Sequence, residues 1–128
     1  MEKRCLHATD APPALGPYSH AVVAGNFVFL SGQGSVTPEG KVAHGTIEEE
    51  THRTFENIQA VLKEAGANLS DVVKVLVFLD DIGNFVPFNQ VYKEYFPENP
   101  PARSCVEAAK LPGGMQVEIE VVALIPGG

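Results

Sequence analysis

The stretch VVKVLVFL, residues 72–79, constrains the fold most, because seven of its eight residues are apolar. Runs of Val, Leu and Phe are typical of β-strands, in which successive side chains point to opposite faces of the sheet. A strand that is apolar on both faces has to be covered on both faces. Whatever fold this chain adopts must therefore bury both sides of a central strand.

Two amphipathic helices are predicted, and they can cover one of those faces. The first spans residues 46–67, where Thr46 and Glu49 form a capping-box pattern and apolar residues recur every three or four positions. The second spans residues 84–96 and ends at Pro97. In a chain of this length, both helices fit on one face of a single sheet.

Four further strands complete the predicted fold. Residues 21–32 indicate two strands joined by a tight turn at Gly25–Asn26, and residues 102–109 and 116–125 indicate the last two. The element order is then β-β-α-β-α-β-β, an α+β fold with two helices on one face of a mixed sheet, in one domain over residues 1–128. Nothing is left to cover the second face, so we expect an oligomer in which copies of the chain cover one another.

Charge and hydropathy argue against some classes of protein. The net charge is −7, from 9 basic and 16 acidic residues, whereas nucleic-acid binding usually requires a basic surface. No apolar run approaches the ~20 residues of a membrane span. The start of the chain, MEKRCLHATDAPP, lacks the apolar core of a signal peptide. We therefore expect a cytoplasmic protein without nucleic-acid or membrane partners.

The cysteines and histidines predict neither a disulfide framework nor a metal site. Cys5 and Cys105 are interpreted as free thiols, with Cys5 in a flexible N-terminal segment. The four histidines lack zinc-ligand spacing and are interpreted as surface or edge residues: His7, His20, His44 and His52. No metal or other cofactor is expected.

One segment poses a chemical question. In PPARSCVEAA, residues 100–109, Arg103 and Cys105 stand two positions apart, so in a strand they share a face. A buried arginine needs an anionic partner. That partner is either Glu118 or Glu120, which share a face of the last strand, or the carboxylate of a substrate.

Other polar positions also stand out, and each has a purely structural alternative. Tyr18 could be a core aromatic residue, and Ser31 and Gly32 could simply end a strand. Asn89 could face solvent from the second helix, and Cys105 could be a small buried apolar residue. The two glutamates could lie at a solvated strand end.

Together these stretches resemble the RidA (YjgF) family of enamine/imine deaminases. The resemblance rests on APPALGPYSHAV, FLSGQ, FENIQAVLKEAG, VVKVLVFLDDIGNF, FNQVY, PARSCVEAAKLP and VEIEVVA, which cover nearly the whole chain. It implies a chorismate-mutase-like homotrimer with pockets at its subunit interfaces. It also implies hydrolysis of 2-aminoacrylate-type enamines, through their 2-imino acid tautomers, to 2-keto acids and ammonia, without a cofactor.

The resemblance further implies a role for each position singled out above. Arg103 is the arginine that binds the substrate carboxylate, Glu118 is the acidic residue that activates water, and Cys105 lies beside the reacting atoms. The remaining pocket residues are Tyr18, Ser31, Gly32 and Asn89, of which Asn89 is expected to support the pocket. Three alternatives stay open: a ribonuclease or translation inhibitor, a non-catalytic ligand-binding regulator or chaperone, and a deaminase for a larger enamine.

Overall fold

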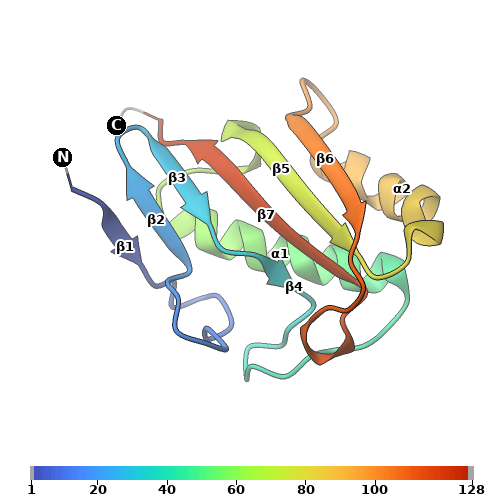
Figure 1. The fold of residues 1–128 in the computed structure, drawn as a ribbon. Helices are drawn as coiled ribbons and strands as arrows, with labels where there is room; N and C mark the ends of the chain where they lie inside the picture. Colours follow the sequence, from blue (N-terminus) through green and yellow to red (C-terminus); the bar gives the residue numbers. More distant parts are fainter. Residues whose placement is uncertain (1, 127–128) are drawn as a thin grey trace.

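The computed structural model describes residues 2–126, which form a seven-stranded sheet with two helices (Figure 1). The strand order is β1-β2-β3-β7-β5-β6, and β4 pairs with β7 outside this path. Only β5 and β6 run parallel. The bounds of the strands and helices are, in chain order, β1 Arg4–Leu6, β2 Ala21–Ala24, β3 Phe27–Leu30, β4 Gln33–Gly34, α1 Ile47–Glu64, β5 Val72–Leu79, α2 Phe85–Tyr95, β6 Ala102–Glu107 and β7 Val117–Leu124.

Both helices lie on the same face of the sheet, as Figure 1 shows, so the predicted arrangement of helices is confirmed. The core consists of this face and the apolar sides of the helices, with Val75, Val77, Ile119, Phe55 and Phe88 fully buried. Because β5 lies between β6 and β7, its apolar residues occupy the centre of the sheet. Neither helix is long and apolar enough to cross a membrane, within residues 2–126.

Local signals in the sequence set the ends of α1. Thr46 Oγ1 accepts a hydrogen bond from Glu49 N (3.1 Å), and Glu49 Oε1 accepts one from Thr46 N (2.9 Å). The predicted capping box is therefore confirmed. These bonds satisfy two backbone donors that have no partner within the helix. Gly66, with φ of 78°, follows the helix in the left-handed conformation that favours glycine.

Three expectations about the N-terminal region are wrong or incomplete. The predicted order lacked β1 and the two-residue β4, which are too short to show a periodic pattern. The segment around Cys5 is a strand, since Cys5 pairs with Val22, although its side chain is exposed. His20 is buried, not on the surface: Nδ1 accepts from Ala8 N (2.8 Å) and Nε2 donates to Pro12 O (2.8 Å). His20 thereby fixes the segment that precedes β2.

The opposite face of the sheet presents apolar side chains that no helix of residues 2–126 covers. Phe29 is 46% exposed, and Val22, Leu76, Phe78 and Val122 are partly exposed. Val22 pairs with Phe29, and Phe29 pairs with Val122, so these three side chains lie side by side on this face. This is the uncovered face that the pattern of residues 72–79 predicts.

A buried carboxylate ties α1 to the start of β7. Glu50 is fully buried, and its oxygens accept hydrogen bonds from Gln116 N (2.9 Å), Gln116 Nε2 (2.7 Å) and Gly45 N (3.3 Å). Three donors therefore converge on one side chain. Since Gln116 is two residues before Glu118, these bonds also position the beginning of β7.

We expect Glu50→Gln to lower the free energy of unfolding by about 2–3 kcal/mol. The amide NH2 group of glutamine would face the N–H donors of Gln116 or Gly45, and these buried donors would lose their acceptor. Denaturant unfolding at one fixed protein concentration measures this. Glu48→Gln is the matched control, since Glu48 is exposed in the same helical turn. Equal stabilities of the two variants would contradict the role assigned to Glu50.

Candidate active site

Arg103 and Cys105 share one face of β6, and the register shows which face it is. Arg103 pairs with Val75 and Cys105 with Val77, and both valines are fully buried beneath the helices. Cross-strand partners point to the same side of a sheet. Arg103 and Cys105 therefore lie on the helix side of the sheet, close to α2.

Residues of α2 hold the Arg103 guanidinium. Its Nη1 donates to Asn89 Oδ1 (2.8 Å), and its Cζ lies 4.6 Å from the ring centroid of Tyr92. The rings of Phe85 and Phe88 lie 5.5 and 5.9 Å from the same atom. Asn89 is thus turned toward Arg103 and is not simply a solvent-facing helix residue. Stacking against aromatic faces suits arginine, whose guanidinium is planar and weakly hydrated.

The guanidinium has no carboxylate partner within the described chain. The one ion pair among residues 2–126 is between Lys63 and Asp10, both exposed. Arg103 uses one N–H donor on Asn89, and a guanidinium has five. Several of its donors therefore remain for a group that the chain itself does not supply.

Burial governs the ionisation of the groups beside Arg103. It raises the pKa of Tyr92 to about 12, against the opposing effect of the Arg103 charge. It also raises the pKa of the Cys105 thiol, again opposed by Arg103. Both groups stay protonated at neutral pH. A protonated thiol is a poor nucleophile, which argues against covalent catalysis by Cys105.

A second group of predicted residues lines a separate depression, made by Tyr18, Ser31, Gly32, Pro112 and Glu118. A Cβ atom on Gly32 would lie 2.5 Å from Glu118 Oε2, so glycine allows the carboxylate to lie against the backbone here. Ser31 Oγ donates to Ser19 O (2.7 Å), and Tyr18 Oη accepts from Leu15 N (3.2 Å). These bonds fix the loop that forms one side of the depression.

The Glu118 carboxyl has a perturbed ionisation. Partial burial raises its pKa above the usual range of glutamate, and the nearby charge of Glu120 raises it further. The two glutamates lie on the same side of β7. The opposite side of this strand is buried and carries Val117, Ile119 and Val121. A carboxylate of raised pKa is a stronger base, as general-base catalysis near neutral pH requires.

The two groups do not meet within one chain. Glu118 pairs with Phe78 on β5, whereas Arg103 and Cys105 pair with Val75 and Val77. Because successive residues of a strand alternate between faces, Glu118 lies on the side opposite to Arg103. The structure thus brings Arg103, Cys105 and Asn89 together, and separately Tyr18, Ser31, Gly32 and Glu118. We refer to them as the arginine half-site and the glutamate half-site.

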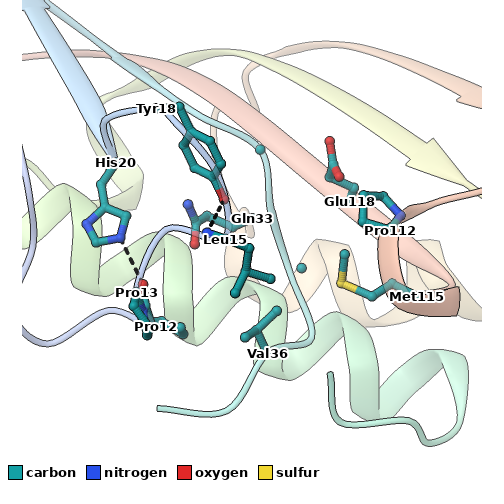
Figure 2. A pocket seen from close by; sticks show the side chains of 12 residues that line it. Pro12, Pro13, Leu15, Tyr18, His20, Gln33, Val36, Pro112, Met115 and Glu118 are labelled. Atoms are coloured by element: carbon teal, nitrogen blue, oxygen red, sulfur yellow. Dashed lines mark hydrogen bonds between the residues drawn. The ribbon is translucent and has the colours of Figure 1, made fainter. Parts of the chain in front are cut away.

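The glutamate half-site adjoins a second pocket of about 190 Å³, shown in Figure 2. The two share four residues: Tyr18, Gly32, Pro112 and Glu118. The other walls are mainly apolar and come from the loop before β2, from β4 with the residues that follow it, and from the turn before β7. Sequence reasoning missed these wall residues, because Leu15, Val36 and Met115 carry no chemical signal of their own.

It also missed the aromatic residues around Arg103, although a signal was present. Phe85, Phe88, Asn89 and Tyr92 recur at the spacing of one helical face. The sequence predicts this segment only as an amphipathic helix that covers the sheet. An asparagine within it indicates a polar group opposite the helix, and that group is Arg103.

This chain has relatives among known proteins. Residues 8–125 match the family model described as endoribonuclease L-PSP, which represents the RidA (YjgF) proteins. The chain belongs to the RidA (YjgF) family. A RutC family protein of Pyrococcus abyssi is 48% identical over 124 residues, which cover 96% of this chain and 98% of that protein. The family resemblance predicted from the motifs is therefore confirmed.

Family members with more informative names are also similar to this chain. Reactive Intermediate Deaminase A of Arabidopsis thaliana, a chloroplastic protein, is 40% identical over 126 residues, covering 98% of this chain and 67% of that protein. The structure of TdcF from Escherichia coli with bound serine is similar with a TM-score of 0.88 and 35% identity, covering 94% of this chain and 98% of that one. The family thus includes a reactive intermediate deaminase and a member that binds a small amino acid.

Proposed function

We propose that the chain is a hydrolytic deaminase that converts 2-aminoacrylate-type enamines, as their 2-imino acid tautomers, to 2-keto acids and ammonia. The observation that carries this proposal is the Arg103 guanidinium, which is held by Asn89 and Tyr92 but has no carboxylate partner within residues 2–126. Its planar fork matches a carboxylate with two parallel hydrogen bonds. The relationship to a reactive intermediate deaminase supports the same substrate class.

The complete site forms between two copies of the chain in this proposal. Arg103 and Glu118 lie on opposite sides of one sheet, so one molecule of substrate cannot contact both within a single chain. In the proposed homotrimer, the arginine half-site of one copy faces the glutamate half-site of the next. The uncovered apolar face around Phe29 and Phe78 supports such an assembly.

Each half-site then supplies a distinct part of the reaction. Arg103 binds the carboxylate and orients the imine carbon toward the Glu118 carboxylate. Glu118 accepts a proton from water as the water oxygen attacks that carbon, and it returns this proton to the nitrogen to give the carbinolamine. The carbinolamine hydroxyl proton then passes to the nitrogen, the C–N bond breaks, and ammonia leaves to give the ketone. Backbone groups at Ser31–Gly32 lie beside Glu118, where they can bind the imine nitrogen. The Tyr18 ring forms the adjoining wall.

A coupled assay tests this function. An amino-acid oxidase generates the imine of alanine, semicarbazide captures what remains, and pyruvate is followed in parallel. The protein is expected to reduce capture of the imine and to accelerate pyruvate formation without added metal or cofactor. Capture that is unchanged over a wide range of protein concentrations would contradict the proposal.

The name of the matching family model favours a second function, cleavage of RNA. The net charge of −7 argues against it, because RNA binding depends on neutralising phosphates. RNA cleavage that persists through repeated purification and in Arg103→Ala would support this second function, since the carboxylate-binding role of Arg103 has no part in it.

The Glu118 pKa predicts the pH dependence of the deaminase. Activity requires the carboxylate form, so kcat/KM falls as the pH drops through the Glu118 pKa, which burial and Glu120 hold above the usual glutamate range. In Glu120→Gln the repulsive charge is gone and the Glu118 pKa is lower. We expect the acidic limb of the profile to move to lower pH, measured from about pH 4 to 8. The exposed Glu98→Gln is the control, and a limb that stays in place or moves upward in Glu120→Gln would contradict this assignment.

A further inference from the structure

The pocket beside Glu118 extends well beyond the reacting position, into an apolar part. We call this part the apolar annex and define it by its wall residues: Pro12, Pro13, Leu15, Val36, Pro112 and Met115. Figure 2 shows Leu15 and Val36 on one side of it, and Pro112 and Met115 on the other. The whole pocket has a volume of about 190 Å³. An apolar protein cavity of about 150 Å³ is large enough to hold benzene.

Two polar side chains line the pocket next to the annex, His20 and Gln33, and both make hydrogen bonds to the protein backbone. Both ring nitrogens of His20 are used, because Nδ1 accepts a hydrogen bond from Ala8 N and Nε2 donates one to Pro12 O. The Gln33 side-chain amide donates to Ser31 O (3.4 Å). The annex itself presents apolar side chains to a ligand, among them Leu15, Val36 and Met115.

The charged residue that lines both the pocket and the glutamate half-site, Glu118, is acidic. Glu118 lies where the annex meets the glutamate half-site, and no lysine or arginine is among the residues that line either pocket. In the proposed assembly, Arg103 of the next copy is occupied by the substrate's own carboxylate. An anionic side chain in the annex would therefore lose its hydration without a cation of its own and would lie near the Glu118 carboxylate. An apolar group would lose only contact with water.

We propose that the apolar annex binds the side chain of the substrate, so that the chain acts on 2-imino acids with branched aliphatic or aryl side chains and discriminates against acidic ones. This inference rests on the proposed deaminase function. A substrate whose imine carbon lies at Glu118 directs its substituent into the annex, because the two pockets share Tyr18, Gly32, Pro112 and Glu118. Leu15, Val36 and Met115 then determine which side chains fit.

The test compares imines that differ only in their side chains. Suitable oxidases generate them from alanine, leucine, phenylalanine and glutamate, and the efficiency is the reciprocal of the protein concentration that halves semicarbazide capture. The leucine- and phenylalanine-derived imines are expected to be processed at least about tenfold more efficiently than the glutamate-derived one, since a single methylene in an apolar pocket changes kcat/KM by about that factor.

Two variants assign the effect to the annex. Val36→Phe narrows it and is expected to lower the leucine-to-alanine efficiency ratio at least about tenfold. Leu15→Arg adds a cation at the exposed rim and is expected to raise the glutamate-to-leucine ratio by a similar factor. Leu15 is 56% exposed, so its replacement tests the annex even where Val36→Phe does not fold. Leu69→Phe is the control, because Leu69 lines a separate depression together with Phe96 and Pro97.

The possible outcomes separate this inference from the function on which it rests. Acceleration with alanine but not with leucine or phenylalanine would overturn the annex and leave the deaminase in place. Efficiency ratios that are unchanged in both variants would also overturn it. Acceleration with none of the four imines would overturn both proposals.

Discussion

Replacing Arg103 with lysine is expected to lower the kcat/KM for the alanine-derived imine by about 10²–10³-fold. Lysine keeps the positive charge but cannot form two parallel bonds to a carboxylate, and it cannot stack its head group on the Tyr92 ring, which lies 4.6 Å from Arg103 Cζ. Hydrogen bonds to charged groups contribute about 1.5–3 kcal/mol each. A loss of about 3–4 kcal/mol in transition-state binding corresponds to the stated factor.

The control for this variant is Arg4→Lys, because Arg4 is an exposed arginine in the edge strand β1. Light scattering and thermal unfolding should show that both variants assemble and unfold like the wild type. A near-normal rate in Arg103→Lys would show that charge alone is enough and would exclude the bidentate clamp. Loss of the oligomer in Arg103→Lys alone would instead indicate that Arg103 is an interface residue, paired with a carboxylate of another copy.

The fold was predictable where patterns are long and repeat. Many residues contribute to the apolar stripe of α1 around Phe55 and Ile58, and to the apolar run of residues 72–79. The spacing of apolar side chains therefore identifies the first as a helix and the second as a strand. The strands β1 and β4 have three and two residues. Their pairing partners hold them in place, and a local sequence of that length carries no period.

For the candidate site, the sequence predicts which residues share a face of a strand but not how the site is divided between the two sides of the sheet. Alternation along a strand places Arg103 with Cys105, and Glu118 with Glu120, on shared faces. It does not say which face of β6 or β7 meets the helices, because that depends on the register between strands that are distant in the sequence. Only the pairing of Arg103 with Val75, and of Glu118 with Phe78, puts the two half-sites on opposite sides.

His20 shows a second limit of sequence reasoning. A lone histidine without metal-ligand spacing is expected at the surface. Here it is buried, and its ring forms hydrogen bonds with Ala8 N and Pro12 O. Neither partner has a side-chain signature, since every residue carries a backbone carbonyl and nearly every residue an N–H group. Interactions between a side chain and the backbone of a loop therefore stay hidden until the loop is seen.

The second large effect is expected for Glu118→Gln, which keeps the shape of the side chain and removes the base. We expect kcat for the alanine-derived imine to fall by about 10²–10⁴-fold, the usual contribution of general-base catalysis. Binding of the unreactive analogue pyruvate should change little, because Arg103 binds the carboxylate in the proposed site. Glu98→Gln, at an exposed position outside both half-sites, is the control.

The pH profile distinguishes a base from a residue that merely shapes the pocket. If Glu118 accepts the proton from water, its raised pKa sets the acidic limb of the wild-type profile. The residual activity of Glu118→Gln should then lack that limb and rise with hydroxide concentration, as expected when solvent replaces the base. A residual activity that keeps the wild-type limb would mean that another group titrates. A near-normal rate would remove Glu118 from the chemistry and leave the arginine half-site to act by positioning alone.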